Sequence, residues 1–279
     1  MELNKRIKGK ALYMPSGKAG EYAKFAVNFY VGCSNDCTYC YCKRGVLGHA
    51  MGAPIATLKK CFKNEAHALG VFSKEVKANL DVLREHGLFF TFTSDPMLCE
   101  TRELTIAAVG YAASFGIPCK ILTKRADFIN YLPCEWFVKE WYLSRIAFGF
   151  TLTGHDEMEH GASTNVERIA AMKYLHDAGF RTFASIEPVI TLKRSYDVIK
   201  LTLKWCDLYK IGLMSGKRQY TREQVRIWTS YVDGIIGNSL KPKVYWKDSV
   251  LDFIGETREH WDSDCTFHVK ADYNLFDMA

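Results

Sequence analysis

The sequence predicts an α/β protein built on a parallel β-sheet, as either an open doubly wound sheet or a barrel of the (β/α) type. Short apolar runs alternate with longer amphipathic stretches about six times along the chain. Strands that each return through a helix must run parallel. The runs are nearly continuous in apolar residues, as expected for strands that are buried on both faces.

The expected elements alternate in order along the chain. Strands are expected at residues 24–33, 88–95, 117–125, 145–153, 180–190 and 207–216, with a further strand at 243–250. Helices are expected at residues 73–87, 101–116, 165–179, 195–206 and 221–236. Gly87 and Gly116 are stop signals for the first two helices. Asn165 is the expected cap of the third helix, and Thr221 with Gln224 forms a capping box for the last.

Composition excludes several classes of protein. The 279 residues are 48% apolar and 24% charged, which is too apolar for a disordered chain. No apolar run reaches the roughly 18 residues that a membrane helix needs. The basic N-terminus lacks an apolar segment behind it, so we expect no signal peptide and a cytoplasmic protein with reduced thiols. We expect one domain over residues 1–254 and a tail, residues 255–279, that packs on it.

Polar residues follow the apolar runs at the point where each predicted strand ends. In parallel α/β folds these ends meet at one edge of the sheet and form the active site. The strand-end residues are Cys33, Cys37 and Cys40; Thr93, Ser94 and Asp95; Lys124 and Arg125; Thr151 and Thr153; Glu187 and Pro188; and Met214, Ser215, Gly216 and Lys217.

Three of the ten cysteines form a short cluster, Cys33-x3-Cys37-x2-Cys40. Zinc normally takes four ligands, usually as two separated pairs, and no second pair lies at a matching spacing. Cys42 is the next thiol, but strand-like alternation would point it away from Cys40. Three thiolates on one loop suit an iron–sulfur cubane instead, with one of its four irons left open. Elsewhere, Cys119 and Cys206 are expected to be small core residues.

This loop resembles the CxxxCxΦC motif of the radical S-adenosylmethionine (SAM) superfamily, with Tyr39 as the aromatic residue Φ. The resemblance implies a partial (β/α)6 TIM-like barrel and a [4Fe–4S] cluster held by the three cysteines. It further implies that SAM binds the open iron through its amino and carboxylate groups. Reductive cleavage would then release methionine and a 5′-deoxyadenosyl radical that takes a hydrogen atom from a substrate. An external one-electron donor such as flavodoxin or ferredoxin is implied as a partner.

Five further segments resemble the spore photoproduct lyase group within that superfamily. The resemblance implies that Ser94, Lys124, Thr151 and Glu187 contact SAM and that Tyr39 lies beside the adenine. These residue types are suitable, because a lysine pairs with a carboxylate and hydroxyl groups bond to polar atoms of SAM. The matching segments are YCY at 39–41, TSDP at 93–96, ILTKR at 121–125, GFTL at 149–152 and EPVI at 187–190.

One departure separates this sequence from the lyase itself. The lyase carries a hydrogen-donating cysteine directly before Thr-Ser-Asp, where this chain has Phe92. Cys99 lies seven residues further on and is the candidate replacement, while Tyr41 matches one member of the lyase's tyrosine pair. We therefore expect the scaffold and the cofactor chemistry of this group, but not the lyase reaction.

The substrate class stays open at this point. Basic residues near the expected site would suit a nucleic acid or a nucleotide, and peptides or small molecules remain alternatives. Two other classes of protein also remain: a non-catalytic iron–sulfur protein for electron transfer or sensing, and a zinc-stabilised nucleic-acid-binding module. The basic residues are Lys124, Arg125, Lys217, Arg218 and Arg222.

Overall fold

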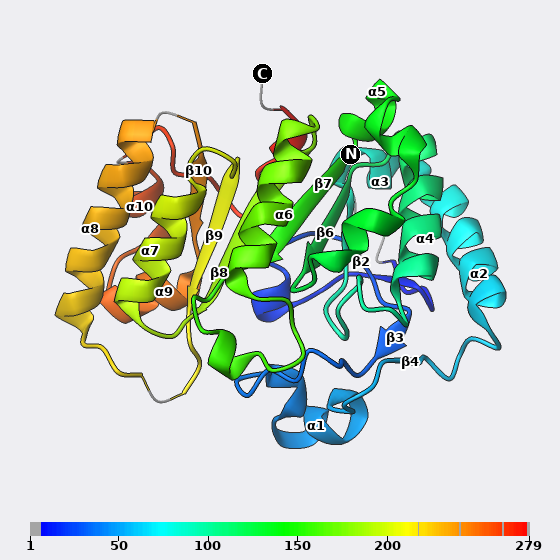
Figure 1. Cartoon of the computed structure of the whole chain (residues 1–279), viewed down its shortest axis with the longest axis horizontal. Helices are drawn as coiled ribbons and strands as arrows, with labels where there is room; N and C mark the ends of the chain where they lie inside the picture. The colour runs from blue at the N-terminus through cyan, green and yellow to red at the C-terminus, as the bar shows by residue number, and fades with distance from the viewer. Residues whose placement is uncertain (1–6, 217, 240, 264, 278–279) are drawn as a thin grey trace.

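An open eight-stranded sheet forms the centre of the computed structural model, which describes residues 7–216, 218–239, 241–263 and 265–277. The strand order is β1-β2-β5-β6-β7-β8-β9-β10, in which β1 is antiparallel to β2 and every other neighbouring pair is parallel (Figure 1). The predicted α/β fold of parallel strands is confirmed, and the sheet does not close into a full barrel. The strands are β1 Leu12–Tyr13, β2 Ala26–Val27, β3 Tyr30–Val31, β4 Thr57–Leu58, β5 Leu88–Phe90, β6 Cys119–Thr123, β7 Ile146–Thr151, β8 Arg181–Val189, β9 Leu208–Leu213 and β10 Lys243–Trp246.

Helices cover the outer face of the sheet, with α4 against β6, α6 against β7 and β8, and α7 against β8 (Figure 1). All residues of β7 and of β9 are buried, which explains their continuous apolar sequences. The α-helices are α1 Gly45–Met51, α2 Glu65–Ala78, α3 Leu80–His86, α4 Arg102–Ser114, α5 Glu140–Leu143, α6 Asn165–Asp177, α7 Leu192–Thr202, α8 Arg222–Ser239, α9 Asp248–Ile254 and α10 Arg258–Ser263. The 3-10 helices are η1 Gly17–Ala19, η2 Tyr41–Lys43, η3 Asp127–Tyr131, η4 Cys134–Phe137, η5 Asp156–Met158 and η6 Leu275–Asp277.

Two expected elements are divided in the structure. The strand expected at 24–33 is two short strands in different sheets, because β3 leaves the main sheet and pairs with β4. The helix expected at 73–87 begins earlier, at an Asn64 cap that accepts from the His67 amide at 2.8 Å. It is interrupted at Asn79, whose side chain donates to the Glu75 carbonyl at 2.7 Å. Such local side-chain bonds compete with helix continuation.

One of the two predicted helix caps is confirmed, and the other is wrong. Thr221 and Gln224 form the expected reciprocal bonds at 2.8 and 3.2 Å. Asn165 is not the cap of α6, because Thr164 takes that position in a capping box with Glu167. The predicted burial of Cys119 and Cys206 is confirmed, since both are 0% exposed.

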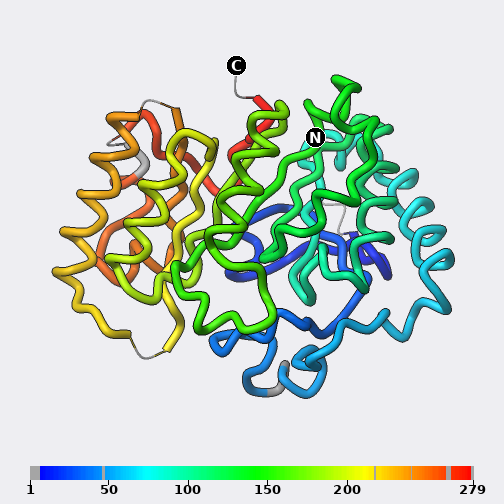
Figure 2. The backbone as a smooth tube through the Cα atoms, viewed as in Figure 1, coloured from blue at the N-terminus to red at the C-terminus, as the bar shows by residue number. Residues whose placement is uncertain are grey.

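The C-terminal segment lies at the end of the sheet where the strands begin. Val244 in β10 donates to Phe267 and accepts from Val269, so the segment runs beside the edge strand. Leu275 is fully buried in a core cluster on the inner face of the sheet with Phe89 and Phe183. In Figure 2 the red end of the chain lies at the top, and the blue segment that carries the cysteines lies at the bottom. None of the helices within the described ranges is long and apolar enough to cross a membrane.

Candidate active site

A cavity of about 510 Å³ opens at the carboxyl ends of the strands. It is enclosed by the loop that carries the cysteine cluster, by the loop after β5, and by the ends of β6 to β10. All the predicted cluster ligands, SAM contacts and catalytic residues except Cys99 line it. The lining residues that the sequence predicted are Cys33, Cys37, Cys40, Tyr39, Tyr41, Ser94, Lys124, Thr151 and Glu187.

The cysteine loop is held in place by backbone contacts at both of its sides. The Cys33 amide donates to the Ala53 carbonyl at 3.0 Å. The Thr38 amide donates to the Met158 carbonyl at 2.9 Å, and Cys37 forms an isolated antiparallel bridge with Glu159. The segment after β7 therefore fixes the backbone of the middle cysteine.

Asp95 ties the cysteine loop to the ends of two strands. One carboxylate oxygen accepts from the Asn35 side chain and the Lys124 amide, both at 2.7 Å. The other accepts from the Thr123 hydroxyl at 2.6 Å and the Met97 amide at 2.9 Å. Because a carboxylate only accepts hydrogen bonds, these four donors satisfy it fully and hold Asn35 and Lys124 at fixed positions around the cavity.

A buried ion pair supports the cysteine loop from behind, and sequence reasoning missed it. Arg168 is 0% exposed, pairs with the buried Glu159 and donates to the Thr151 carbonyl. The Tyr39 hydroxyl donates to the other oxygen of Glu159. The available signal was an arginine in the apolar stripe of α6, on the same face as Met172 and Leu175.

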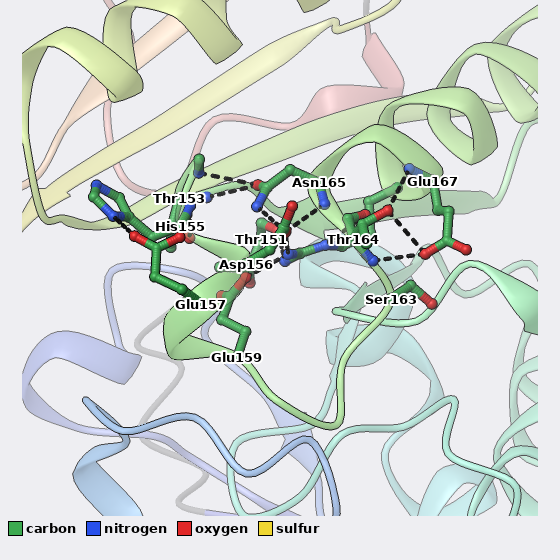
Figure 3. Close-up of polar contacts among 12 residues, drawn as sticks. Thr151, Thr153, His155, Asp156, Glu157, Glu159, Ser163, Thr164, Asn165 and Glu167 are labelled. Atoms are coloured by element: carbon green, nitrogen blue, oxygen red, sulfur yellow. Dashed lines mark hydrogen bonds and ion pairs between the residues drawn. The ribbon is translucent and has the colours of Figure 1, made fainter.

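Asn165 shapes the loop that carries Glu159 (Figure 3). Its carbonyl oxygen accepts from the backbone amides of Thr153 and Gly154 at 3.1 and 3.0 Å. Its amide nitrogen donates to Asp156 at 2.6 Å. The side chain therefore serves the loop after β7, which leaves the capping role to Thr164.

Lys124 places a positive charge in the cavity. Its Nζ lies 5.6 Å from the centre of the Tyr39 ring. Burial by itself lowers the pKa of Lys124, but negative charge on Cys37 and Glu159 outweighs burial, so the pKa is raised. Lys124 makes no ion pair within 4.0 Å with any residue that the structure describes, so its ammonium is available to an anionic ligand.

Two buried polar atoms around the cavity lack partners. The Oδ1 atom of Asn35 and the Oγ atom of Ser94 are both inaccessible to solvent and make no hydrogen bond among the described residues. Asn35 is only 2% exposed. Leaving such atoms unpaired costs free energy. They fit a polar ligand such as SAM, which would supply the missing partners.

The two carboxylate oxygens of Glu187 differ, because only one of them accepts hydrogen bonds from the described residues. Its Oε2 accepts from the Tyr22 hydroxyl at 2.8 Å and from Lys247 Nζ at 2.7 Å. Lys247 is 0% exposed, also pairs with Glu21 at 3.2 Å, and follows the last strand directly. Sequence reasoning missed Lys247, because it lies inside the strand predicted at 243–250, whereas the observed strand ends at Trp246. Oε1 of Glu187 makes no hydrogen bond within the described part of the chain.

The three clustered thiols differ in acidity. The pKa of Cys40 is lowered to about 6, because Cys42 hydrogen-bonds its sulfur and Lys124 adds positive charge. Burial, together with the nearby Asp95, raises the pKa of Cys33 to about 12. Within the described ranges, no three His, Cys, Asp or Glu side chains gather around a point that could hold a single metal ion. A cubane binds each thiolate to a separate iron, so its ligands need not meet at one point.

The prediction that Cys42 points away from Cys40 is wrong. Cys42 lies in the 3-10 helix η2 rather than in a strand, so period-two alternation does not apply. Its side chain lines the cavity and is within hydrogen-bonding reach of Cys40.

Cys99 is not brought to the cavity. It is exposed, and its thiol donates to the neighbouring Glu100 carboxylate at 3.1 Å. Phe92 does line the cavity, so the loop that carries it has the expected position.

Most of the expected basic residues also lie outside the cavity. Arg125 is bound to Asp127 and to the Gly161 carbonyl, and Arg218 packs on the Phe253 ring. Neither residue lines the cavity, nor does Arg222, and Lys217 lies outside the described residues. The basic residues that line it are Lys18, Lys43, Arg44, Lys124 and Lys247.

Solved structures of radical SAM enzymes share this fold. One variant of spore photoproduct lyase superposes with a TM-score of 0.61 at 12% sequence identity, covering 88% of this chain and 81% of the lyase. A second variant has a TM-score of 0.61 at 14% identity and covers 85% and 79% of the two chains. The resemblance to spore photoproduct lyase is therefore confirmed at the level of the fold.

SuiB from Streptococcus suis, solved with bound SAM, is a more distant match. Its TM-score is 0.51 at 11% identity, over 77% of this chain, and this chain spans only 44% of SuiB. No protein-family model and no curated protein matches the chain by sequence.

Proposed function

We propose that this protein is a radical SAM enzyme. Cys33, Cys37 and Cys40 hold a [4Fe–4S] cluster, and SAM occupies the adjoining cavity. When bound, the cluster supplies the electron that splits SAM into methionine and a 5′-deoxyadenosyl radical, which takes a hydrogen atom from the substrate. The observation that supports this most directly is one cavity that contains the three thiols together with unpaired, buried polar atoms.

The chain's own residues bind and orient SAM in this proposal. Lys124 pairs with the SAM carboxylate, since its ammonium makes no ion pair within 4.0 Å among the described residues. Ser94 and Asn35 satisfy their buried polar atoms on SAM, and Oε1 of Glu187 accepts from a ribose hydroxyl or from the ammonium group. Tyr39 lies beside the adenine, held by its bond to Glu159.

The proposed activity is tested by anaerobic reconstitution followed by reduction with dithionite in the presence of SAM. We expect the protein to bind iron and sulfide in equal amounts and to release 5′-deoxyadenosine and methionine. Absence of 5′-deoxyadenosine from an iron-replete sample would contradict the proposal and favour an electron-transfer or sensing protein. Zinc in place of iron would favour the zinc-stabilised alternative.

Replacement of Lys124 by alanine is expected to weaken SAM binding and to leave the cluster in place. Loss of a charge-assisted hydrogen bond of about 1.5–3 kcal/mol corresponds to roughly 10- to 150-fold weaker binding. Calorimetric titration of the anaerobic holoprotein measures the affinity, and iron analysis confirms that the cluster is intact. The matched control is Arg125→Ala, which removes the adjacent charge outside the cavity. Unchanged SAM affinity in Lys124→Ala would show that the assumed orientation of SAM is wrong.

The substrate is proposed to be an anionic molecule such as a nucleotide or a nucleic acid. Support comes from Lys18 and Arg44, which are exposed basic residues that line the cavity. A peptide is the alternative, because SuiB has been solved with its precursor peptide SuiA. Transfer of deuterium from a labelled candidate substrate into 5′-deoxyadenosine distinguishes the two. An external flavodoxin or ferredoxin as electron donor, and a location in the cytoplasm, remain part of the proposal.

A further inference from the structure

A fourth thiol, that of Cys42, lies in the same cavity as the three clustered cysteines. Cys42 is 7% exposed and lines the cavity from the 3-10 helix that directly follows Cys40. Its Sγ lies 3.8 Å from the carbonyl oxygen of Phe92, on the loop that also carries Ser94. Cys42 therefore lines the cavity proposed for SAM and contacts the loop after β5.

Two buried cysteines outside the cysteine loop do not share this placement. Cys119 and Cys206 are 0% exposed and belong to the apolar core, and neither lines the cavity. Cys42 instead lines the same cavity as Cys33 and Cys40. The unpaired Oδ1 of the buried Asn35, on the same cavity, independently indicates that a ligand binds there.

We propose that Cys42 is an exchangeable fourth ligand of the cluster, which binds the open iron in the absence of SAM and gives it up when SAM binds. This inference rests on the proposed function. Formation of the sulfur–iron bond releases the thiol proton to solvent, with no change in oxidation state. When the amino and carboxylate groups of SAM bind the iron, the sulfur–iron bond breaks and Cys42 takes up a proton again.

Exchange of this kind has a physical benefit for the resting protein. An iron without a protein ligand is the one that oxidation removes from a cubane, which leaves a [3Fe–4S] cluster. A thiolate is a strong, soft ligand for iron, so it protects that corner better than water does. Each corner of the cubane binds one thiolate, so ligation of the open iron moves the Cys42 sulfur away from the Cys40 sulfur, within the cavity.

The inference is tested by oxidising the anaerobic holoprotein with ferricyanide and measuring the [3Fe–4S] signal by electron paramagnetic resonance. Without SAM, we expect oxidised Cys42→Ala to contain at least about three times as much [3Fe–4S] cluster as the oxidised unaltered protein. Cys206→Ala, which removes a buried thiol far from the cavity, is expected to match the unaltered protein. Cys42→Ser makes a smaller structural change and is expected to behave like Cys42→Ala, because a neutral hydroxyl is a poor iron ligand.

The role of SAM is tested in the same samples. Addition of SAM before the oxidant is expected to remove the difference between Cys42→Ala and the unaltered protein, because SAM then holds the iron in both. Equal [3Fe–4S] signals without SAM would overturn the inference. A spectrum of the reduced, unaltered protein that SAM does not change would also overturn it, since it indicates permanent ligation. Failure of the proposed function would give a different result. Iron-replete Cys42→Ala, reduced with dithionite in the presence of SAM, would then release no 5′-deoxyadenosine.

Discussion

Replacement of Cys37 by alanine is expected to abolish cluster binding. Cys37 is the middle ligand of the loop and is 6% exposed, with its backbone bridged to Glu159. Removing it leaves Cys33 and Cys40 as the two permanent ligands for four irons, and the exchangeable Cys42 does not replace the lost corner. After anaerobic reconstitution we expect essentially no protein-bound iron and no visible absorption from the cluster.

The control for this variant is Cys119→Ala. Cys119 is a buried thiol in β6 that does not line the cavity, so its removal tests the effect of losing a buried cysteine alone. We expect Cys119→Ala to bind iron as the unaltered protein does. A Cys37→Ala protein that retains a complete cubane would mean that the ligand set has been assigned incorrectly.

Replacement of Arg168 by methionine is expected to destabilise the protein by about 3–5 kcal/mol, because it leaves the buried Glu159 carboxylate without its partner. Both side chains of the pair are 0% exposed, so water cannot take the place of the guanidinium. The Thr151 carbonyl also loses a donor. Urea denaturation of the metal-free protein measures the free energy of unfolding.

A double variant separates this effect from a simple loss of packing. Glu159→Gln combined with Arg168→Met removes the charge that the single variant leaves unpaired. We therefore expect the double variant to be more stable than Arg168→Met alone, which is the signature of coupled residues. If the two substitutions are simply additive in destabilising the protein, the ion pair is not the source of the effect.

Sequence reasoning located the strand-end residues well, for a reason that lies in the topology. Parallel strands bring their carboxyl ends to one edge, so Ser94, Lys124, Thr151 and Glu187 meet in one cavity although they are far apart in the chain. Residue types and order along the chain were sufficient for that prediction. Contacts between side chains of different loops were not predicted, because no periodic pattern encodes them.

Three examples show what was missed and why. The partner of Arg168 is set by the path of the loop after β7, and that path depends on the side-chain bonds of Asn165. Cys42 faces the cavity because the chain turns into a 3-10 helix after Cys40. Cys99 is exposed because the loop after β5 carries it away from the cavity, although its separation from Phe92 in sequence is small.

The sequence by itself determined the alternation of strands and helices, the edge at which the functional groups meet, and the loop that carries three thiols. These features depend on local periodicity and on short spacings, which act within one element or one loop. Only the tertiary structure decided that Glu159 and Arg168 support the cysteine loop, that Lys247 holds Glu187, and that a fourth thiol enters the cavity. Those contacts arise from packing between distant segments, where burial forces each polar group to find a partner.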